Sequence, residues 1–288
     1  MNTALLFDID NTLTPPRQPL NEEMTEVLKR LSVPFHIVAG SHLKILLGQF
    51  FEPLYQYGFR KQFDAFINLG GVHYRCDYSQ GMSLEVISAF DMRGHLGDAD
   101  FNFLMGVLQD TLALAEFALP PPLKILGETI TYRGAMINLC PIGRTEHESP
   151  AYRANRNYFA EFDLANSYRQ KMMEHLRMEL ERLIEERDLT IVLGGQTSFD
   201  ISVSSRDKTY AVHTLLAKGT ERVIFIGDAL FEGGNDASIR ELAESWASET
   251  VCPLETIQVE SWTDTIKQLC ELGFVGDLSN QEMSRLAP

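Results

Sequence analysis

Short apolar runs alternate with helical patterns in the first part of the chain. Residues 4–7, 35–39 and 66–69 are apolar runs of strand length, each closed by a polar or glycine-rich turn. Residues 21–31 begin with a capping asparagine and carry apolar positions at three- and four-residue spacing, which favours a helix. A further apolar run, 222–226, follows a helical pattern later in the chain. Strands that alternate with helices predict an α/β domain with a parallel, Rossmann-like sheet.

The middle of the chain has a different pattern. Amphipathic spacing predicts a helix over 101–118 and a long charged helix over 165–187. Segments of strand character lie between and after these helices, at 130–132, 135–139, 189–193 and 199–203.

These two patterns predict a core interrupted by an insertion. We interpret residues 82–187 as an inserted α+β cap domain that follows the third core strand. The catalytic core is then made of residues 1–81 and 188–288, with the segment 188–205 returning the chain to the core.

Composition excludes several classes of protein. The chain of 288 residues carries a net charge of −15, which argues against nucleic acid as a general partner. Its apolar runs fall short of the roughly 20 residues of a membrane span, and a strand starts too early to leave room for a signal peptide. The four cysteines, Cys76, Cys140, Cys252 and Cys270, have neither metal-ligand nor disulfide-framework spacing, so we expect a cytoplasmic protein.

Candidate chemistry begins where the first strand ends, at Asp8 and Asp10. Open α/β sheets bind ligands at the carboxyl ends of their strands. There Asp8 can attack phosphorus, and Asp10 can pass a proton to or from the oxygen that leaves or attacks. Two neighbouring carboxylates need a cation, and Mg²⁺ prefers oxygen ligands. An acidic turn after an edge strand is the alternative interpretation of these residues alone.

Two later positions add a hydroxyl group and a positively charged side chain to the candidate site. Ser41 follows the second core strand and can hydrogen-bond a transferred phosphoryl group, although it could also simply cap the helix expected over 43–50. Lys44 is a weaker alternative contact for the phosphate. Lys208 opens a helix over 210–216 and can neutralise a phospho-aspartate.

An acidic loop follows the strand 222–226. Asp228 comes directly after it and can bind Mg²⁺ opposite Asp8. Asn235 and Asp236, which follow two glycines, are candidates for the same metal centre, for holding the loop, or for holding Lys208.

The predicted cap carries its own polar positions. Arg133 and Arg144 flank a strand pair that includes Asn138, and arginine suits bidentate phosphate recognition. Ser198 and Asp200 are two residues apart on one side of a strand, where they could hold sugar hydroxyls. Surface salt bridges are the alternative for the arginines.

In this order the motifs resemble the haloacid dehalogenase superfamily, and more narrowly its eukaryotic-type phosphomannomutases, which carry a type IIB cap. The resemblance covers about residues 1–240. It rests on the Asp-x-Asp-x-Thr motif, on the segments 133–144 and 194–201, and on the Gly-Asp and Gly-Gly-Asn-Asp stretch near 227–236.

The resemblance implies a role for each position. Asp8 is expected to be the nucleophile and Asp10 the general acid/base, with Mg²⁺ held by Asp8, the Asp10 carbonyl and Asp228. Arg17 is expected to reach the substrate. The cap residues are expected to bind the phosphate that does not react and the sugar: Arg133, Asn138, Arg144, Ser198 and Asp200.

The implied activity is a phosphohexomutase that moves phosphate between C6 and C1 of a hexose, with a hexose 1,6-bisphosphate as activator and dimerisation through the cap. Several positions depart from the family pattern, and the most consequential is Leu126, which stands where family members usually carry an arginine. A Mg²⁺-dependent sugar-phosphate phosphatase is therefore the alternative. A non-catalytic sugar-phosphate binder is disfavoured by the presence of Asp8, Asp10, Lys208 and Asp228.

Overall fold

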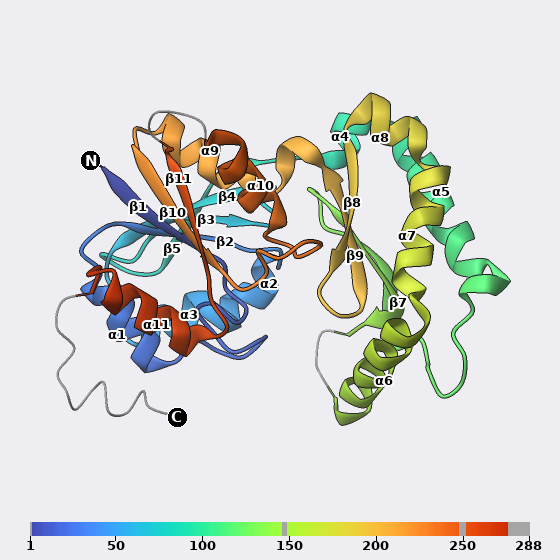
Figure 1. Ribbon diagram of the computed structural model, residues 1–288, viewed down its shortest axis with the longest axis horizontal. Coiled ribbons are helices and arrows are strands. Elements are labelled where there is room, and N and C mark those ends of the chain that lie inside the picture. Colours follow the sequence, from blue (N-terminus) through green and yellow to red (C-terminus); the bar gives the residue numbers. More distant parts are fainter. Residues whose placement is uncertain (1, 146–148, 248–251, 276–288) are drawn as a thin grey trace. The chain divides into compact units, whose positions relative to one another are not determined.

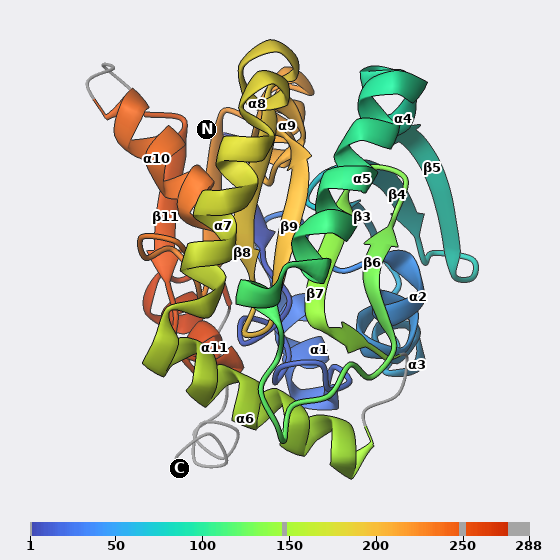
Figure 2. The same ribbon diagram turned by 90° about the vertical axis from the view of Figure 1, so that its right-hand side faces the viewer.

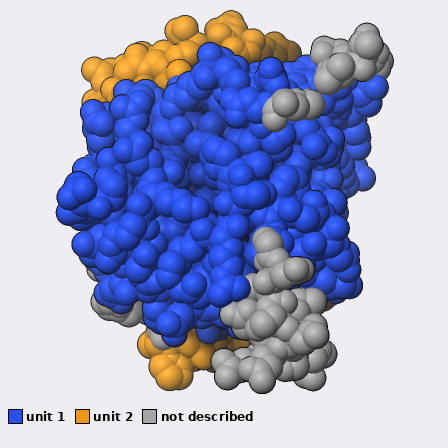
Figure 3. Space-filling view, turned by 90° about the vertical axis from the view of Figure 1, so that its left-hand side faces the viewer, with its two compact units in different colours: residues 1–89, 208–288 blue, residues 90–207 orange. Residues whose placement is uncertain are grey.

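The computed structural model describes residues 2–145, 149–247 and 252–275. The chain forms two compact units, one made of Met1–Ala89 and Lys208–Pro288 and the other of Phe90–Asp207 (Figure 3). The predicted α/β core with an inserted α+β unit is thus present. No helix among the described residues is both long and apolar enough to cross a membrane.

A seven-stranded sheet forms the centre of the first unit, in the order β11-β10-β1-β2-β3-β4-β5. The first five strands in that order are parallel, and β4 and β5 continue the sheet antiparallel. The strands are β1 (Thr3–Phe7), β2 (Phe35–Val38), β3 (Gln62–Ile67), β4 (Val72–Asp77), β5 (Ser83–Ala89), β10 (Arg222–Gly227) and β11 (Leu254–Gln258).

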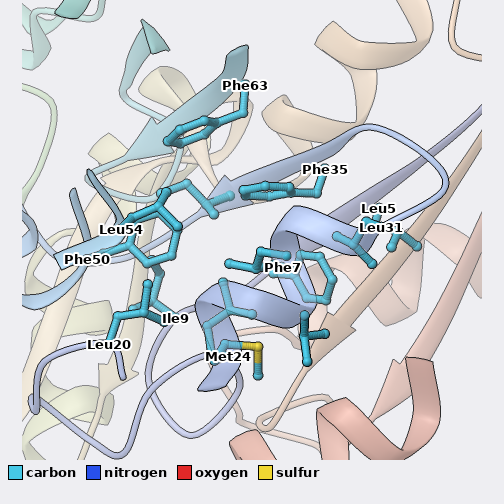
Figure 4. Packing of buried hydrophobic residues seen from close by; sticks show 14 of the residues in the cluster. Leu5, Phe7, Ile9, Leu20, Met24, Leu31, Phe35, Phe50, Leu54 and Phe63 are labelled. Carbon is cyan, nitrogen blue, oxygen red and sulfur yellow. The ribbon is translucent and has the colours of Figure 1, made fainter. Parts of the chain in front are cut away.

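Helices cover both faces of this sheet, because its parallel strands are apolar on both sides (Figure 1). One face packs on α9 (Thr209–Ala217) and α10 (Ala237–Trp246). The other face packs on α1 (Glu22–Arg30), α2 (Leu43–Leu46), a π-helical turn (Leu47–Phe51), α3 (Glu52–Gln56) and α11 (Trp262–Glu271). Aromatic rings dominate the core on this second face, where Phe7 contacts Phe35, Phe35 stacks on Phe63, and Phe63 contacts Phe50 of the π turn (Figure 4).

The second unit is an antiparallel sheet with helices on one face (Figure 2). Its strand order is β6-β7-β9-β8, with β6 (Glu128–Tyr132), β7 (Ile137–Arg144), β8 (Leu189–Gly194) and β9 (Ser198–Val203). The helices are α4 (Met92–Leu96), α5 (Asp98–Ala113), α6 (Pro150–Asn166), α7 (Tyr168–Glu179) and α8 (Glu181–Arg187), with 3₁₀ turns at Ala115–Phe117 and Ser204–Arg206. Alternating residues of β7 and β9, such as Ile137 and Ile201, face the helices.

The structure shifts both predicted domain boundaries. Residues 72–89 form the hairpin β4–β5, which extends the core sheet, so the insertion begins after the fifth strand and not after the third. The sequence analysis assigned residues 189–203 to the core, but they form β8 and β9 of the inserted unit. There β9 pairs with β7 and β8 pairs with β9.

The long helix expected over 165–187 is wrong in its extent. Ser167 adopts a left-handed conformation, with φ of 52°, which ends α6 and starts α7 in a new direction. A second break at Leu180 separates α7 from α8. The charged segment that precedes 165 is helical too, as α6, and its N-cap Ser149 accepts a hydrogen bond from the N–H of Tyr152.

Candidate active site

The carboxyl ends of β1 and β10 bring two of the predicted aspartates together. These strands are parallel neighbours, with Phe7 opposite Ile226 in the register. Asp8 and Asp228 follow them directly, so both side chains lie at the same edge of the sheet. Asp8 is only 4% exposed, and its backbone N–H donates to the carbonyl of Ile226 at 3.0 Å.

Lys208 reaches this edge from the start of α9. Its ammonium donates to Asp8 Oδ1 at 2.8 Å and to Asp236 Oδ1, and the whole side chain is buried. Burial alone would lower the pKa of Lys208, but the charges of Asp236 and Asp8 outweigh it and raise the pKa above its usual value. The ammonium therefore stays charged beside the nucleophile candidate.

The cluster carries more negative than positive charge. Carboxylate oxygens of Asp8, Asp228 and Asp236 lie within 4.8 Å of one another. Burial raises the pKa of Asp8 far above its ordinary value, and the neighbouring carboxylates add to this while Lys208 opposes it. With all three carboxylates ionised, the ammonium would balance one negative charge and a divalent cation the other two. The oxygen donors therefore fit Mg²⁺.

Asp228 is oriented by a residue that the sequence analysis did not single out. Asn11 donates from Nδ2 to Asp228 Oδ2 at 3.0 Å. It can do so because its backbone is left-handed, with φ of 58°, a conformation that asparagine tolerates better than most residues. Burial raises the pKa of Asp228, and the hydrogen bond from Asn11 opposes the rise.

Asp236 holds Lys208 and the loop at the same time. One of its oxygens pairs with Lys208, and the other accepts the backbone N–H of Ala229 at 3.2 Å. Asp236 thus braces both the loop and the lysine, and its carboxylate also belongs to the acidic cluster that could hold a metal ion. Asn235 precedes it in the loop, half-buried.

The carboxyl group of Asp10 is held by two donors. The backbone N–H of Arg17 and Nε2 of Gln49 each lie 2.7 Å from Asp10 Oδ1. Gln49 is a second residue that the sequence analysis missed. Gln49 lies in a helical pattern of apolar residues that is typical of core packing. The one unusual feature nearby in the sequence is Pro53, which interrupts that helical pattern.

Ser41 lies after β2, near the same edge of the sheet. Its carbonyl accepts the backbone N–H of Asn68 at 3.2 Å, which ties the β2 loop to the end of β3. The N-cap of α2 is His42, which makes no side-chain capping bond. Capping the helix, the alternative role for Ser41, is thus not what the structure displays.

In the second unit, polar residues of β7 and β9 meet on one sheet face. Asn138 is directly opposite Asp200 in the register and donates to its Oδ1 at 2.6 Å. Arg144 donates from Nη2 to Ser198 Oγ at 3.1 Å, and Ser198 donates onward to the carbonyl of Gly194 at 2.6 Å. These four residues form two hydrogen-bonded pairs on the same two strands, and we call them together the β7–β9 patch.

Two further arginines belong near this sheet. Arg133 lies in the β6–β7 turn, where its backbone N–H donates to the carbonyl of Met136 at 2.8 Å. Arg156 on α6 was not singled out from the sequence. Its charge, like that of Arg144, acts on buried Cys140, so it lies in the same neighbourhood.

Solved structures of other proteins share this fold. An N-terminally truncated, IMP-bound IMP-nucleotidase of Plasmodium falciparum superposes with a TM-score of 0.58 at 16% identity, covering 94% of this chain and 68% of that one. The C-terminal domain of a Candida albicans trehalose-6-phosphate phosphatase gives 0.56 at 14% identity, covering 95% and 92%. At these identities the likeness shows the fold alone, and it agrees with the expected α/β core and inserted α+β cap.

Proteins found by sequence comparison are more similar in sequence to this chain than these structures are. The sequence profile described as eukaryotic phosphomannomutase matches residues 20–273. Phosphomannomutase 2 of Dictyostelium discoideum is 30% identical over 265 residues, covering 90% of this chain and 95% of the relative. The phosphomannomutase of Saccharomyces cerevisiae is 32% identical over 276 residues, covering 94% of each. The chain therefore belongs to the eukaryotic phosphomannomutase family, as the resemblance of its motifs predicted.

Proposed function

We propose that this protein is a phosphohexomutase, most simply one that interconverts mannose 6-phosphate and mannose 1-phosphate. Family membership over most of the chain supports this activity. The observation that carries it is the buried pairing of Asp8 with Lys208, beside Asp228 and Asp236. This arrangement suits a carboxylate nucleophile that must accept a phosphoryl group next to fixed positive charge.

The proposed chemistry has two half-reactions. A carboxylate oxygen of Asp8 attacks phosphorus, the bond to the sugar oxygen breaks, and Asp10 gives that oxygen a proton. The phosphoryl donor in this half is a hexose bisphosphate, which becomes a monophosphate. In the second half, the free hydroxyl of a hexose monophosphate loses its proton to Asp10 and attacks the phospho-aspartate, which restores Asp8 and forms the bisphosphate. Lys208 balances the charge of the transferred group, and Ser41 donates a hydrogen bond to it.

Mg²⁺ is the proposed cofactor. Asp8, the carbonyl of Asp10 and Asp228 would hold it, with Asn235 and Asp236 completing the surroundings. Bound there, the cation would balance the excess carboxylate charge and polarise the phosphoryl oxygens. Asn11 would keep Asp228 in place for this role.

The second unit is proposed to bind the phosphate that does not react. Arg133 and Arg144 provide planar guanidinium groups for it, and Ser198 holds Arg144 in orientation. Asp200 and Asn138 offer acceptors and donors for sugar hydroxyls, and Arg17 is proposed as a substrate contact from the core. A mutase needs such a second phosphate-binding function because the bisphosphate must react at both ends.

Hydrolysis is the alternative activity, and Leu126 favours it. This aliphatic residue, whose backbone N–H donates to the carbonyl of Ile142 at 2.7 Å, occupies a position where family members usually carry arginine. Fewer cationic contacts weaken the hold on the distal phosphate. The enzyme would then act as a Mg²⁺-dependent sugar-phosphate phosphatase.

A ³¹P NMR time course separates the two activities. The protein is mixed with mannose 1-phosphate, Mg²⁺ and a trace of glucose 1,6-bisphosphate as activator. The mutase proposal expects the signal to move to mannose 6-phosphate with little inorganic phosphate. Accumulation of inorganic phosphate as the main product would contradict it and support the phosphatase.

We further propose that the protein works in the cytoplasm and dimerises through its second unit. All four cysteines are free thiols in the structure, as a reducing compartment favours. Exposed apolar side chains on α6 and α7, Leu164 and Met178, offer contact area. Sedimentation equilibrium of the wild type and of the double variant Leu164→Glu/Met178→Glu tests the dimer.

A further inference from the structure

The helical segment after β2 changes its winding near Gln49. It runs as α2, then as a π turn over Leu47–Phe51, then as α3. Proline at position 53 has no N–H to donate to the carbonyl four residues earlier, which is that of Gln49. That carbonyl instead accepts the backbone N–H of Leu20 at 2.7 Å, so the π turn is joined to the loop behind Asp10.

The π turn directs a polar side chain into the core. Gln49 is 4% exposed, and its neighbours Phe50 and Phe51 are fully buried. Figure 4 shows Phe50 and Leu20 packed in this part of the core. A buried amide among apolar side chains is expensive unless it is hydrogen-bonded, and wide turns of this kind are frequent at functional sites.

The Gln49 amide makes two hydrogen bonds toward the aspartate motif. Nε2 donates to Asp10 Oδ1 at 2.7 Å and to Thr14 Oγ1 at 2.9 Å. A carboxylate oxygen only accepts, so the nitrogen and not the oxygen of the amide faces Asp10. Both amide hydrogens are thus used to hold the motif.

These contacts distinguish the two oxygens of Asp10. Oδ1 receives the N–H of Arg17 as well as Nε2 of Gln49, each at 2.7 Å. Two donors fill that oxygen and fix the plane of the carboxyl group. We propose that Gln49 is a positioning residue, which orients Asp10 so that Oδ2 carries the proton exchanged with the substrate oxygen. This inference rests on the proposed general acid/base role of Asp10.

A pair of phosphate esters tests it. Phenyl phosphate has a poor leaving group that needs a proton, whereas 2,4-dinitrophenyl phosphate has a good one that does not. The value of kcat/KM covers the steps up to release of the leaving group. For Gln49→Met we expect a loss of about 30-fold with phenyl phosphate and less than about threefold with the dinitrophenyl ester.

Asp10→Asn serves as the benchmark for the proposed function. It should lose about 10³-fold with phenyl phosphate and far less with the dinitrophenyl ester. Equal losses in Asp10→Asn would refute the acid/base role itself. If Asp10→Asn discriminates between the esters but Gln49→Met does not, the positioning role of Gln49 is wrong and the function stands.

A matched control and a second variant distinguish loss of Asp10 orientation from a general loss of folding. Gln62 donates from Nε2 to Asp77 Oδ2 at 2.7 Å on the exposed surface, and Gln62→Leu should leave both esters unchanged. If Gln49→Met melts below the assay temperature, Thr14→Val removes the other partner of the amide while Gln49 remains. It should show the same discrimination between esters, about threefold to tenfold, and an equal effect on both would also overturn the proposal.

Discussion

The core unit and the inserted unit present their polar side chains in different ways. In the core, Asp8 and Asp228 lie together because they follow neighbouring parallel strands. In the inserted unit, Asn138 and Asp200 lie together because antiparallel strands place them opposite each other on one sheet face. The first arrangement depends on where strands end, and the second depends on register.

The two groups also differ in charge and burial. The core cluster buries carboxylates around the Lys208 ammonium, whereas the β7–β9 patch is partly open and includes the guanidinium of Arg144. Removing a charge from the core should therefore stop chemistry, while removing one from the patch should weaken selection of the substrate. Three predictions test this division and a fourth probes the stability of the core alone, in order from the largest effect to the smallest.

Asp8→Asn should have the largest effect. Without the carboxylate nucleophile no phospho-enzyme can form, so turnover of both hexose phosphate and aryl phosphate should fall by about 10⁴-fold or more. Steady-state kinetics with both substrates measures this. Circular dichroism should show an unchanged fold, and activity that survives in a folded variant would place the nucleophile elsewhere.

Arg144→Ala should distinguish the role of the second unit from that of the core. Mutase turnover should drop about 100-fold, because a charged contact to the distal phosphate is lost, while hydrolysis of an aryl phosphate changes by less than about threefold. Arg93→Ala, which removes an exposed ion pair with Asp98 in the same unit, is the control and should affect neither. Equal losses on both substrates in Arg144→Ala would argue against a distal phosphate role.

Magnesium should stabilise the core even without substrate. At 100 times its dissociation constant a bound ion adds about 2.7 kcal/mol to the free energy of unfolding. Thermal melting with and without Mg²⁺ measures this shift, which Asp228→Asn should abolish and Arg144→Ala should retain. A shift of the same size in Asp228→Asn would remove Asp228 from the metal centre.

Acid should destabilise the core through a histidine away from the chemistry. His36 accepts the backbone N–H of Asp64 at 3.0 Å, and burial lowers its pKa to about 4, although the Asp64 carboxylate opposes this. The unfolded chain therefore binds the proton first, and the free energy of unfolding should fall by about 1.6 kcal/mol between pH 6.5 and 5.

Tryptophan fluorescence can follow the pH-dependent unfolding of the core alone. The chain has two tryptophans, Trp246 and Trp262, and both belong to the first unit. Urea unfolding at each pH gives the free energy. His36→Asn, which keeps a hydrogen-bond acceptor, should flatten the dependence by more than half. Equal slopes in the two proteins would show that other groups take up the proton.

The chain by itself determined the fold class, the family and the acidic residues of the core. Asp8 and Asp228 could be predicted because each directly follows a strongly apolar strand, so a local pattern places them. The polar alternation around Asn138 and Asp200 likewise predicted strands with one polar face. These features need only neighbours in sequence.

Tertiary structure alone decided which sheet β8 and β9 join and which side chains support the aspartates. The sequences of β8 and β9 do not show which sheet these strands belong to. They join the sheet of the second unit because β9 pairs with the distant β7 and β8 pairs with β9. Gln49 meets Asp10 from a π turn whose Gln49 carbonyl accepts the backbone N–H of Leu20. Such contacts join segments far apart in the chain, and local patterns do not encode them.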